Sequence, residues 1–149
     1  MDDDLIIKTS NLTKSYGPHV ALRNLNISVP KGATGLLGPN GAGKSTFLKT
    51  ILGLIQATEG EGHVMGLDIR TQGDAIRSRI GYMPEYDSLN PDMEAIHQVR
   101  YSGELLGMNP TIALARAHET LQYVGLGEQR YQKIGSYSTG MKQATKLAC

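Results

Sequence analysis

Residues 38–46 (GPNGAGKST) carry the clearest chemical signal in the sequence. They fit the pattern G-x-x-x-x-G-K-[ST], in which glycines let the backbone turn and point its N–H groups inward. Those donors, with the positive end of a following helix, can hold a polyphosphate. Lys44 would place a cation on the terminal phosphates, and the Ser45 hydroxyl would ligate Mg²⁺. The predicted phosphate-contacting residues are Gly38, Pro39, Asn40, Gly41, Ala42, Gly43, Lys44, Ser45 and Thr46.

The elements on either side must position this loop. Residues 33–37 (ATGLL) read as a short buried strand that leads into it. Apolar residues at helical spacing follow the loop: Phe47, Leu48, Ile51, Leu52 and Ile55. The predicted helix ends near Gly53. Phosphate-binding loops of this type lie between a strand and a helix, which is the order predicted here. The competing interpretation is a glycine-rich turn that opens an ordinary helix.

The remainder of the first half reads as strands. Short β-rich runs cover residues 5–7, 12–16 and 25–29, and turn residues separate them. A glycine-rich hairpin is predicted for residues 60–68 and a further core strand for residues 79–83. These strands around a phosphate loop predict an α/β fold, a P-loop NTPase core with an antiparallel β region at its N-terminus.

The second half is predicted to be helical. Asn90 and Pro91 resemble a helix cap and first residue, as do Asn109 and Pro110, and Gly125 should end the second helix. The apolar faces of these two helices are Met93, Ile96, Val99 and Leu106, then Leu114, Ala117, Leu121 and Val124. We therefore expect one domain, with a β-rich core over residues 1–89 and a helical subdomain over residues 90–149.

A third helix start follows in residues 137–143 (YSTGMKQ). Ser138 and Gly140 precede apolar residues at helical spacing, and exposed N–H groups at such a start can bind an anion. Taken alone, the segment is better explained as an ordinary serine cap.

The two motifs together resemble the ATP-binding cassette (ABC) family of transporter ATPases. In that family a signature motif, L-S-G-G-Q, closes on the γ-phosphate of ATP held by the P-loop of a second subunit. Ser138 and Gly140 match its serine and second glycine, while Tyr137, Thr139 and Met141 replace the other residues. The form YSTGMKQ resembles the branch that serves ABC-2 exporters. The resemblance extends from about residue 5 to residue 149.

The resemblance assigns roles to two further residues. Tyr16, in KSYG, matches the aromatic residue that stacks on adenine in the family. The alternative interpretation of Tyr16 is a core tyrosine at the end of a strand. Glu85, in GYMPE, falls where the family has the Q-loop glutamine, which links Mg²⁺ and the γ-phosphate to the membrane partner. The resemblance thus makes Lys44 and Glu85 catalytic candidates and Ser45 and Glu85 metal candidates, whereas a solvated loop carboxylate is the alternative for Glu85.

Other parts of the family's hydrolytic machinery lie C-terminal to the signature motif. They are the Walker B strand, the catalytic glutamate beside it and the switch histidine, and we find no substitute for them in this sequence. The chain thus resembles roughly 60–65% of a nucleotide-binding domain, lacking the C-terminal part of the central sheet. We expect this segment to bind ATP without efficient hydrolysis, and alone to be marginally stable or aggregation-prone.

Composition limits the binding partners and the cellular location that we expect for the protein. The net charge is +1 and the basic residues are scattered, so nucleic acid is not an expected partner. Cys149 is the only cysteine, and no apolar run approaches the ~20 residues of a membrane helix. The resemblance implies a second nucleotide-binding domain, homo- or heterodimeric with ATP between the copies, and a separate transmembrane permease at the cytoplasmic face of a membrane.

Two other functions compete with an exporter ATPase. A non-catalytic module that binds nucleotide or a partner is the main alternative. A GTPase or small-molecule kinase is the other, but the N-K-x-D motif that reads guanine in GTPases does not occur.

Overall fold

A computed structural model describes residues 5–86 and 88–149. The chain divides into two compact units, residues 1–81 and 82–149, and each has its own hydrophobic core. The structure groups the loop after residue 81 with the helices, while the domain division after residue 89 stays a prediction.

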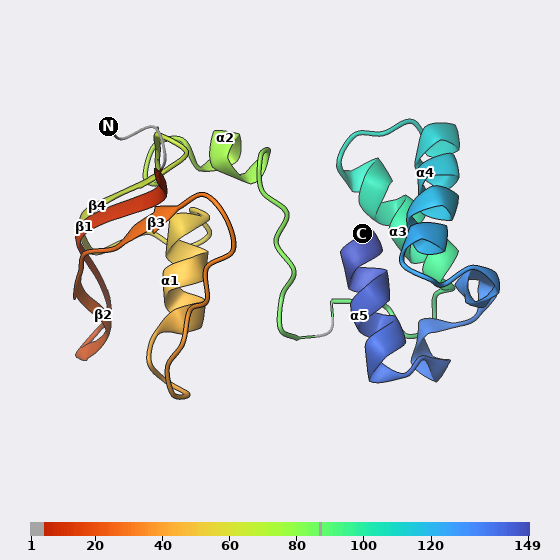
Figure 1. Cartoon of the computed structure of the whole chain (residues 1–149), viewed down its shortest axis with the longest axis horizontal. Helices are drawn as coiled ribbons and strands as arrows, with labels where there is room; N and C mark the ends of the chain where they lie inside the picture. Colours follow the sequence, from red (N-terminus) through yellow and green to blue (C-terminus); the bar gives the residue numbers. More distant parts are fainter. Residues whose placement is uncertain (1–4, 87) are drawn as a thin grey trace. The chain divides into compact units, whose positions relative to one another are not determined.

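The first unit contains an antiparallel sheet and two helices (Figure 1). Its strands are β1 (Leu5–Tyr16), β2 (His19–Leu25), β3 (Ser28–Pro30), β4 (Glu59–Val64) and β5 (Leu67–Asp68). The strand order is β2-β1-β4-β5, and β3 also pairs with β1. Every strand pair among the described residues is antiparallel. The predicted antiparallel region and the predicted hairpin at residues 60–68 are therefore confirmed.

The strand boundaries differ from those predicted. The runs at residues 5–7 and 12–16 form one strand, β1, which continues through Asn11 with φ +50°. Strand β2 was not predicted, because polar residues interrupt its apolar pattern. The predicted strand at residues 25–29 instead spans the end of β2 and the start of β3.

Helix α1 (Lys44–Ile51) packs against this sheet. The shared core consists of Leu12, Leu22, Phe47, Ile51, Val64, Ile69 and Ile76. The helix ends at Ile51 with Leu52 as its C-cap, and Gly53 follows with φ +65°, near the predicted end. Arg77, at the end of α2 (Gly73–Arg77), donates from Nη1 to the carbonyls of Leu52 at 3.1 Å and Gly53 at 3.3 Å. A cation at a helix C-terminus is favourable, so Arg77 helps to hold α1 in place.

Two predicted core strands do not form. Residues 33–37 and 79–83 pair with no other described segment. Leu37 is 93% exposed and Met83 is 51% exposed, so neither segment is buried. An apolar run forms a strand only where a partner satisfies its backbone groups, and the partners of a parallel strand come from distant parts of a chain. The described residues supply no such partner.

The second unit is helical (Figure 1). Its elements are α3 (Ala95–Leu105), α4 (Pro110–Tyr123), the 3₁₀ helices η1 (Glu128–Tyr131) and η2 (Ile134–Ser136), and α5 (Thr139–Ala148). The predicted helical subdomain is thus observed. No helix in the described ranges is both long and apolar enough to cross a lipid bilayer.

One predicted helix start is confirmed and one is wrong. Asn109 caps α4 by accepting from the Thr111 N–H at 2.9 Å, and Gly125 follows the helix with φ +79°. By contrast, α3 begins at Ala95 rather than after Asn90. The Asn90 side chain accepts from the Asp92 N–H at 3.0 Å, which closes a local turn instead of opening a helix.

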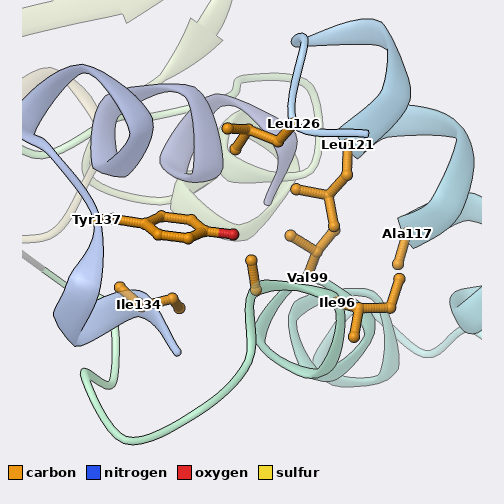
Figure 2. Close-up of a cluster of buried hydrophobic side chains, with 8 residues drawn as sticks. Ile96, Val99, Ala117, Leu121, Leu126, Ile134 and Tyr137 are labelled. Atoms are coloured by element: carbon orange, nitrogen blue, oxygen red, sulfur yellow. The ribbon is translucent and has the colours of Figure 1, made fainter. Parts of the chain in front are cut away.

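Buried residues from α3, α4, η2 and the segments beside them form the second core (Figure 2), and partly buried residues of α5 pack against it. The buried residues are Ala95, Ile96, Val99, Ala117, Leu121, Leu126, Ile134 and Tyr137. The predicted face residues Ile96, Val99, Ala117 and Leu121 are among them, whereas Leu106 is 76% exposed because it lies just beyond the end of α3.

Candidate functional site

The loop before α1 bends sharply, as its glycines predict. Gly41 has φ +83° and Gly43 has φ +84°, a region that favours glycine. Between them, the Ala42 N–H donates to the Pro39 carbonyl at 3.2 Å and closes a tight turn. The loop therefore brings its backbone back to the start of the helix.

Gly43 is required for packing as well as for conformation. A Cβ at this position would lie 2.5 Å from the Ala21 carbonyl oxygen and 3.0 Å from Leu22 Cδ2, both on β2. The same addition at Gly41 would meet nothing within 4 Å. The backbone of β2 thus determines how close the loop can come to the sheet, and only glycine fits at residue 43.

The N-terminus of α1 is suited to an anion. Gly43 is the N-cap and provides no side chain, and the first turn contains no acidic residue. Uncapped N–H groups and the helix dipole together favour negative charge at this end. Lys44 Nζ donates to the carbonyls of Gly38 and Pro39, each at 2.7 Å, so the ammonium lies over the loop. Ser45 is exposed beside it, and its hydroxyl is a suitable oxygen ligand for a hard cation such as Mg²⁺.

Tyr16 lies at the end of β1, in the same unit as the loop. Its side chain is 49% exposed, so it is not a core tyrosine. Lys14 Nζ lies 4.8 Å from the centroid of its ring. Strand β2 pairs with β1 and also contacts Gly43, and this hairpin therefore connects the tyrosine to the phosphate loop.

The signature segment forms a second helix N-terminus. The Ser138 hydroxyl accepts from the Met141 N–H at 3.3 Å and caps α5, whose first turn also lacks acidic residues. Ser138 and Gly140 are both exposed. Tyr137, just before them, is buried in the helical core and its hydroxyl donates to the Gln129 carbonyl at 2.5 Å (Figure 2).

The anchoring role of Tyr137 was not predicted, because the sequence pattern identified only its place in the motif. Burial raises the pKa of its phenol, in keeping with a neutral, structural side chain. The cap and the anchor together hold the exposed serine and glycine at a defined position in the second unit.

Glu85 is exposed in a bend of the second unit. The main-chain carbonyls of Pro84, Glu85 and Tyr86 accept from Lys146 Nζ, on α5, at 3.3 to 3.4 Å. Lys146 was missed at the sequence level because main-chain acceptors leave no signature in residue types. The second unit therefore brings the Glu85 loop to the helix that carries Ser138, while Tyr16 and the phosphate loop belong to the first unit.

A comparison with known families agrees with these observations. Residues 22–149 match the ABC transporter family. The chain belongs to this family. The resemblance to this family, found in the sequence, is thereby confirmed.

Several curated relatives are named as export or resistance proteins. The linearmycin resistance ATP-binding protein LnrL of Bacillus subtilis is 36% identical over 143 residues, which are 95% of this chain and 46% of the relative. The daunorubicin/doxorubicin resistance ATP-binding protein DrrA of Streptomyces peucetius is 34% identical and is covered to 43%. The chain thus spans about half the length of the curated relatives it matches.

Solved ABC structures share the fold. The ADP conformation of MJ1267, an ATP-binding cassette of an ABC transporter, superposes with a TM-score of 0.78 at 26% identity, over 97% of this chain and 63% of MJ1267. The structure of cbiO1 from Clostridium perfringens gives a TM-score of 0.82 at 22% identity, over 97% of this chain and 60% of cbiO1, and supports the fold alone. The predicted fold class is therefore confirmed.

Proposed function

We propose that the protein is the ATP-binding subunit of an ABC exporter and that it couples ATP binding and hydrolysis to transport through a separate transmembrane permease. The observation that carries the proposal is the start of α1, where an uncapped helix N-terminus, Gly43 against β2 and the Lys44 ammonium converge on one loop. Each of these features favours a bound polyphosphate.

Different residues of the first unit would contact different parts of the nucleotide. The main-chain N–H groups available in residues 38–46 would bind the phosphates, and the Lys44 ammonium would bind the β- and γ-phosphates. Tyr16 offers an exposed ring on which adenine can stack. Mg²⁺ prefers oxygen ligands, and the candidates for that role are the Ser45 hydroxyl and, by the family resemblance, the Glu85 carboxylate. Bound Mg²⁺ would neutralise charge on the phosphates.

A second nucleotide-binding domain completes the proposed site. Ser138 and Gly140 are exposed at the start of α5, where they are accessible to a phosphate held by another copy. Two nucleotides between the copies would join them through charge-assisted hydrogen bonds, and loss of the γ-phosphate would release them. This dimer, with its permease, would work at the cytoplasmic face of the membrane.

Export is favoured over import by the relatives. Their names include linearmycin resistance, daunorubicin/doxorubicin resistance and Nod factor export. The permease, and not this chain, would determine which substrate is transported.

A non-catalytic binding module is the second candidate, and it applies to the 149-residue segment taken alone. The segment contains the phosphate loop and the signature, but no identified residue to polarise the attacking water. Phosphate release by the segment distinguishes the candidates. Robust turnover that depends on Lys44 would rule out the non-catalytic module.

The test of the proposal is Lys44→Ala in the full-length natural protein, with ATP affinity measured by titration calorimetry in the presence of Mg²⁺. A hydrogen bond to a charged group contributes about 1.5–3 kcal/mol, so we expect affinity to fall by about 10- to 100-fold. Lys49→Ala removes an exposed lysine from the last turn of the same helix and should leave affinity unchanged. Equal affinity in the wild type and Lys44→Ala would contradict the proposal.

A further inference from the structure

Lys146, in the last turn of α5, binds three consecutive carbonyls of the loop that carries Glu85. Its Nζ lies 3.3 Å from the Pro84 oxygen, 3.4 Å from the Glu85 oxygen and 3.3 Å from the Tyr86 oxygen. An ammonium group has three N–H donors, so it can serve three acceptors at once. One side chain therefore links the loop to the helix that begins at Ser138.

Burial distinguishes Lys146 from a surface lysine. The residue is only 7% exposed. Lysine normally extends its ammonium into water, because moving an unpaired charge into the protein interior is costly. A buried ammonium therefore requires acceptors around it, and its place in the last turn of α5 is also favoured by the helix dipole. The three loop carbonyls help to meet that requirement.

The loop depends on the ammonium in return. Glu85 and Tyr86 lie in a bend outside any helix or strand, so no regular backbone ladder holds their carbonyls. Carbonyl oxygens that converge on one point repel one another unless a donor lies between them. Loss of the ammonium would leave these three acceptors without that donor and would let the loop adopt other conformations.

We propose that Lys146 is a positioning residue that joins the Glu85 loop to α5. The inference rests on the proposed function, in which Glu85 faces Mg²⁺ and Ser138 faces the γ-phosphate of a nucleotide on another copy. About two turns of regular helix separate Ser138 from Lys146, which makes a stiff connection. A movement of Glu85 at the nucleotide is therefore transmitted through Lys146 to the helix that carries Ser138.

The experiment is a double-mutant cycle on ATP turnover by the full-length natural protein. The variants are Lys146→Met, Glu85→Ala and the two combined, since methionine keeps an unbranched side chain and removes the charge. We expect Lys146→Met to lower kcat by about tenfold and to change the KM for ATP by less than about twofold. Added to Glu85→Ala, the same substitution should cause no further fall, because Lys146 acts through the Glu85 loop.

A matched control removes a lysine elsewhere in the second unit. Lys133 is exposed, so Lys133→Met should retain wild-type turnover. Wild-type turnover in Lys146→Met, or an equal fall with and without Glu85→Ala, would overturn the positioning role. Should Lys146→Met not fold, as judged by thermal unfolding, Lys146→Leu, which also removes the charge and the N–H donors, is taken through the same cycle with the same two decisive outcomes. ATP affinity that does not depend on Lys44 would instead contradict the proposed function, so the two failures are distinguishable.

Discussion

The N-termini of α1 and α5 differ in how their first N–H groups are satisfied. Helix α1 is headed by Gly43, which provides no capping side chain, whereas α5 is headed by Ser138, whose hydroxyl accepts from Met141 at 3.3 Å. Neither first turn contains an acidic residue. Helix α1 also has Lys44 at its first position, with its ammonium 2.7 Å from the Gly38 carbonyl.

This difference indicates that the two helix starts play unequal parts. The loop before α1 combines backbone donors and a cation in one short segment, so it can hold a phosphate group by itself. Helix α5 already uses one N–H in its own cap, and its exposed serine and glycine are better suited to adding contacts to a phosphate held elsewhere. The first helix start should therefore tolerate substitution poorly, and the second more readily.

The largest expected effect is that of Gly43→Ala on stability. The left-handed backbone costs an alanine about 1–2 kcal/mol, and overpacking against Ala21 adds about 1–3 kcal/mol. We expect the free energy of unfolding of the full-length protein, measured in urea, to fall by about 3 kcal/mol. Gly41→Ala has the same backbone conformation but open space, and so should lose only about 1–2 kcal/mol. Equal losses in the two variants would show that contact with β2 does not constrain the loop.

A smaller effect is expected at the second helix start. Ser138→Ala removes the cap of α5 and should lower the free energy of unfolding by about 1 kcal/mol. Ser136→Ala is the matched control, because its exposed hydroxyl donates to the Lys133 carbonyl and caps no helix N-terminus, and it should stay within about 0.5 kcal/mol of the wild type. A loss for Ser138→Ala as large as that for Gly43→Ala would remove the distinction between the two helix starts.

Local signals in the sequence predicted much of this structure. The bend at Gly41 and Gly43, the cap at Asn109 and the cap at Ser138 each depend on a few neighbouring residues, and each is observed. Asn90 shows the limit of such signals, because the same asparagine geometry can close a turn as well as start a helix.

Features that depend on distant segments were not predictable in the same way. Residues 33–37 and 79–83 have strand-like composition, but composition does not reveal whether a pairing partner is available. The role of the buried Lys146 was missed for a related reason, since it donates to backbone carbonyls about 60 residues earlier in the chain. The roles of Tyr16, Glu85 and Ser138 at a nucleotide remain predictions.

Amide hydrogen exchange of the full-length natural protein, with and without ATP and Mg²⁺, tests the unequal roles of the two helix starts most directly. At protein concentrations too low for dimers, we predict that ATP protects the amides of residues 38–46 and leaves those of residues 138–143 unchanged. Protection of residues 138–143 should appear only as the protein concentration rises and copies associate. An absence of protection at residues 38–46 under saturating ATP would contradict the account.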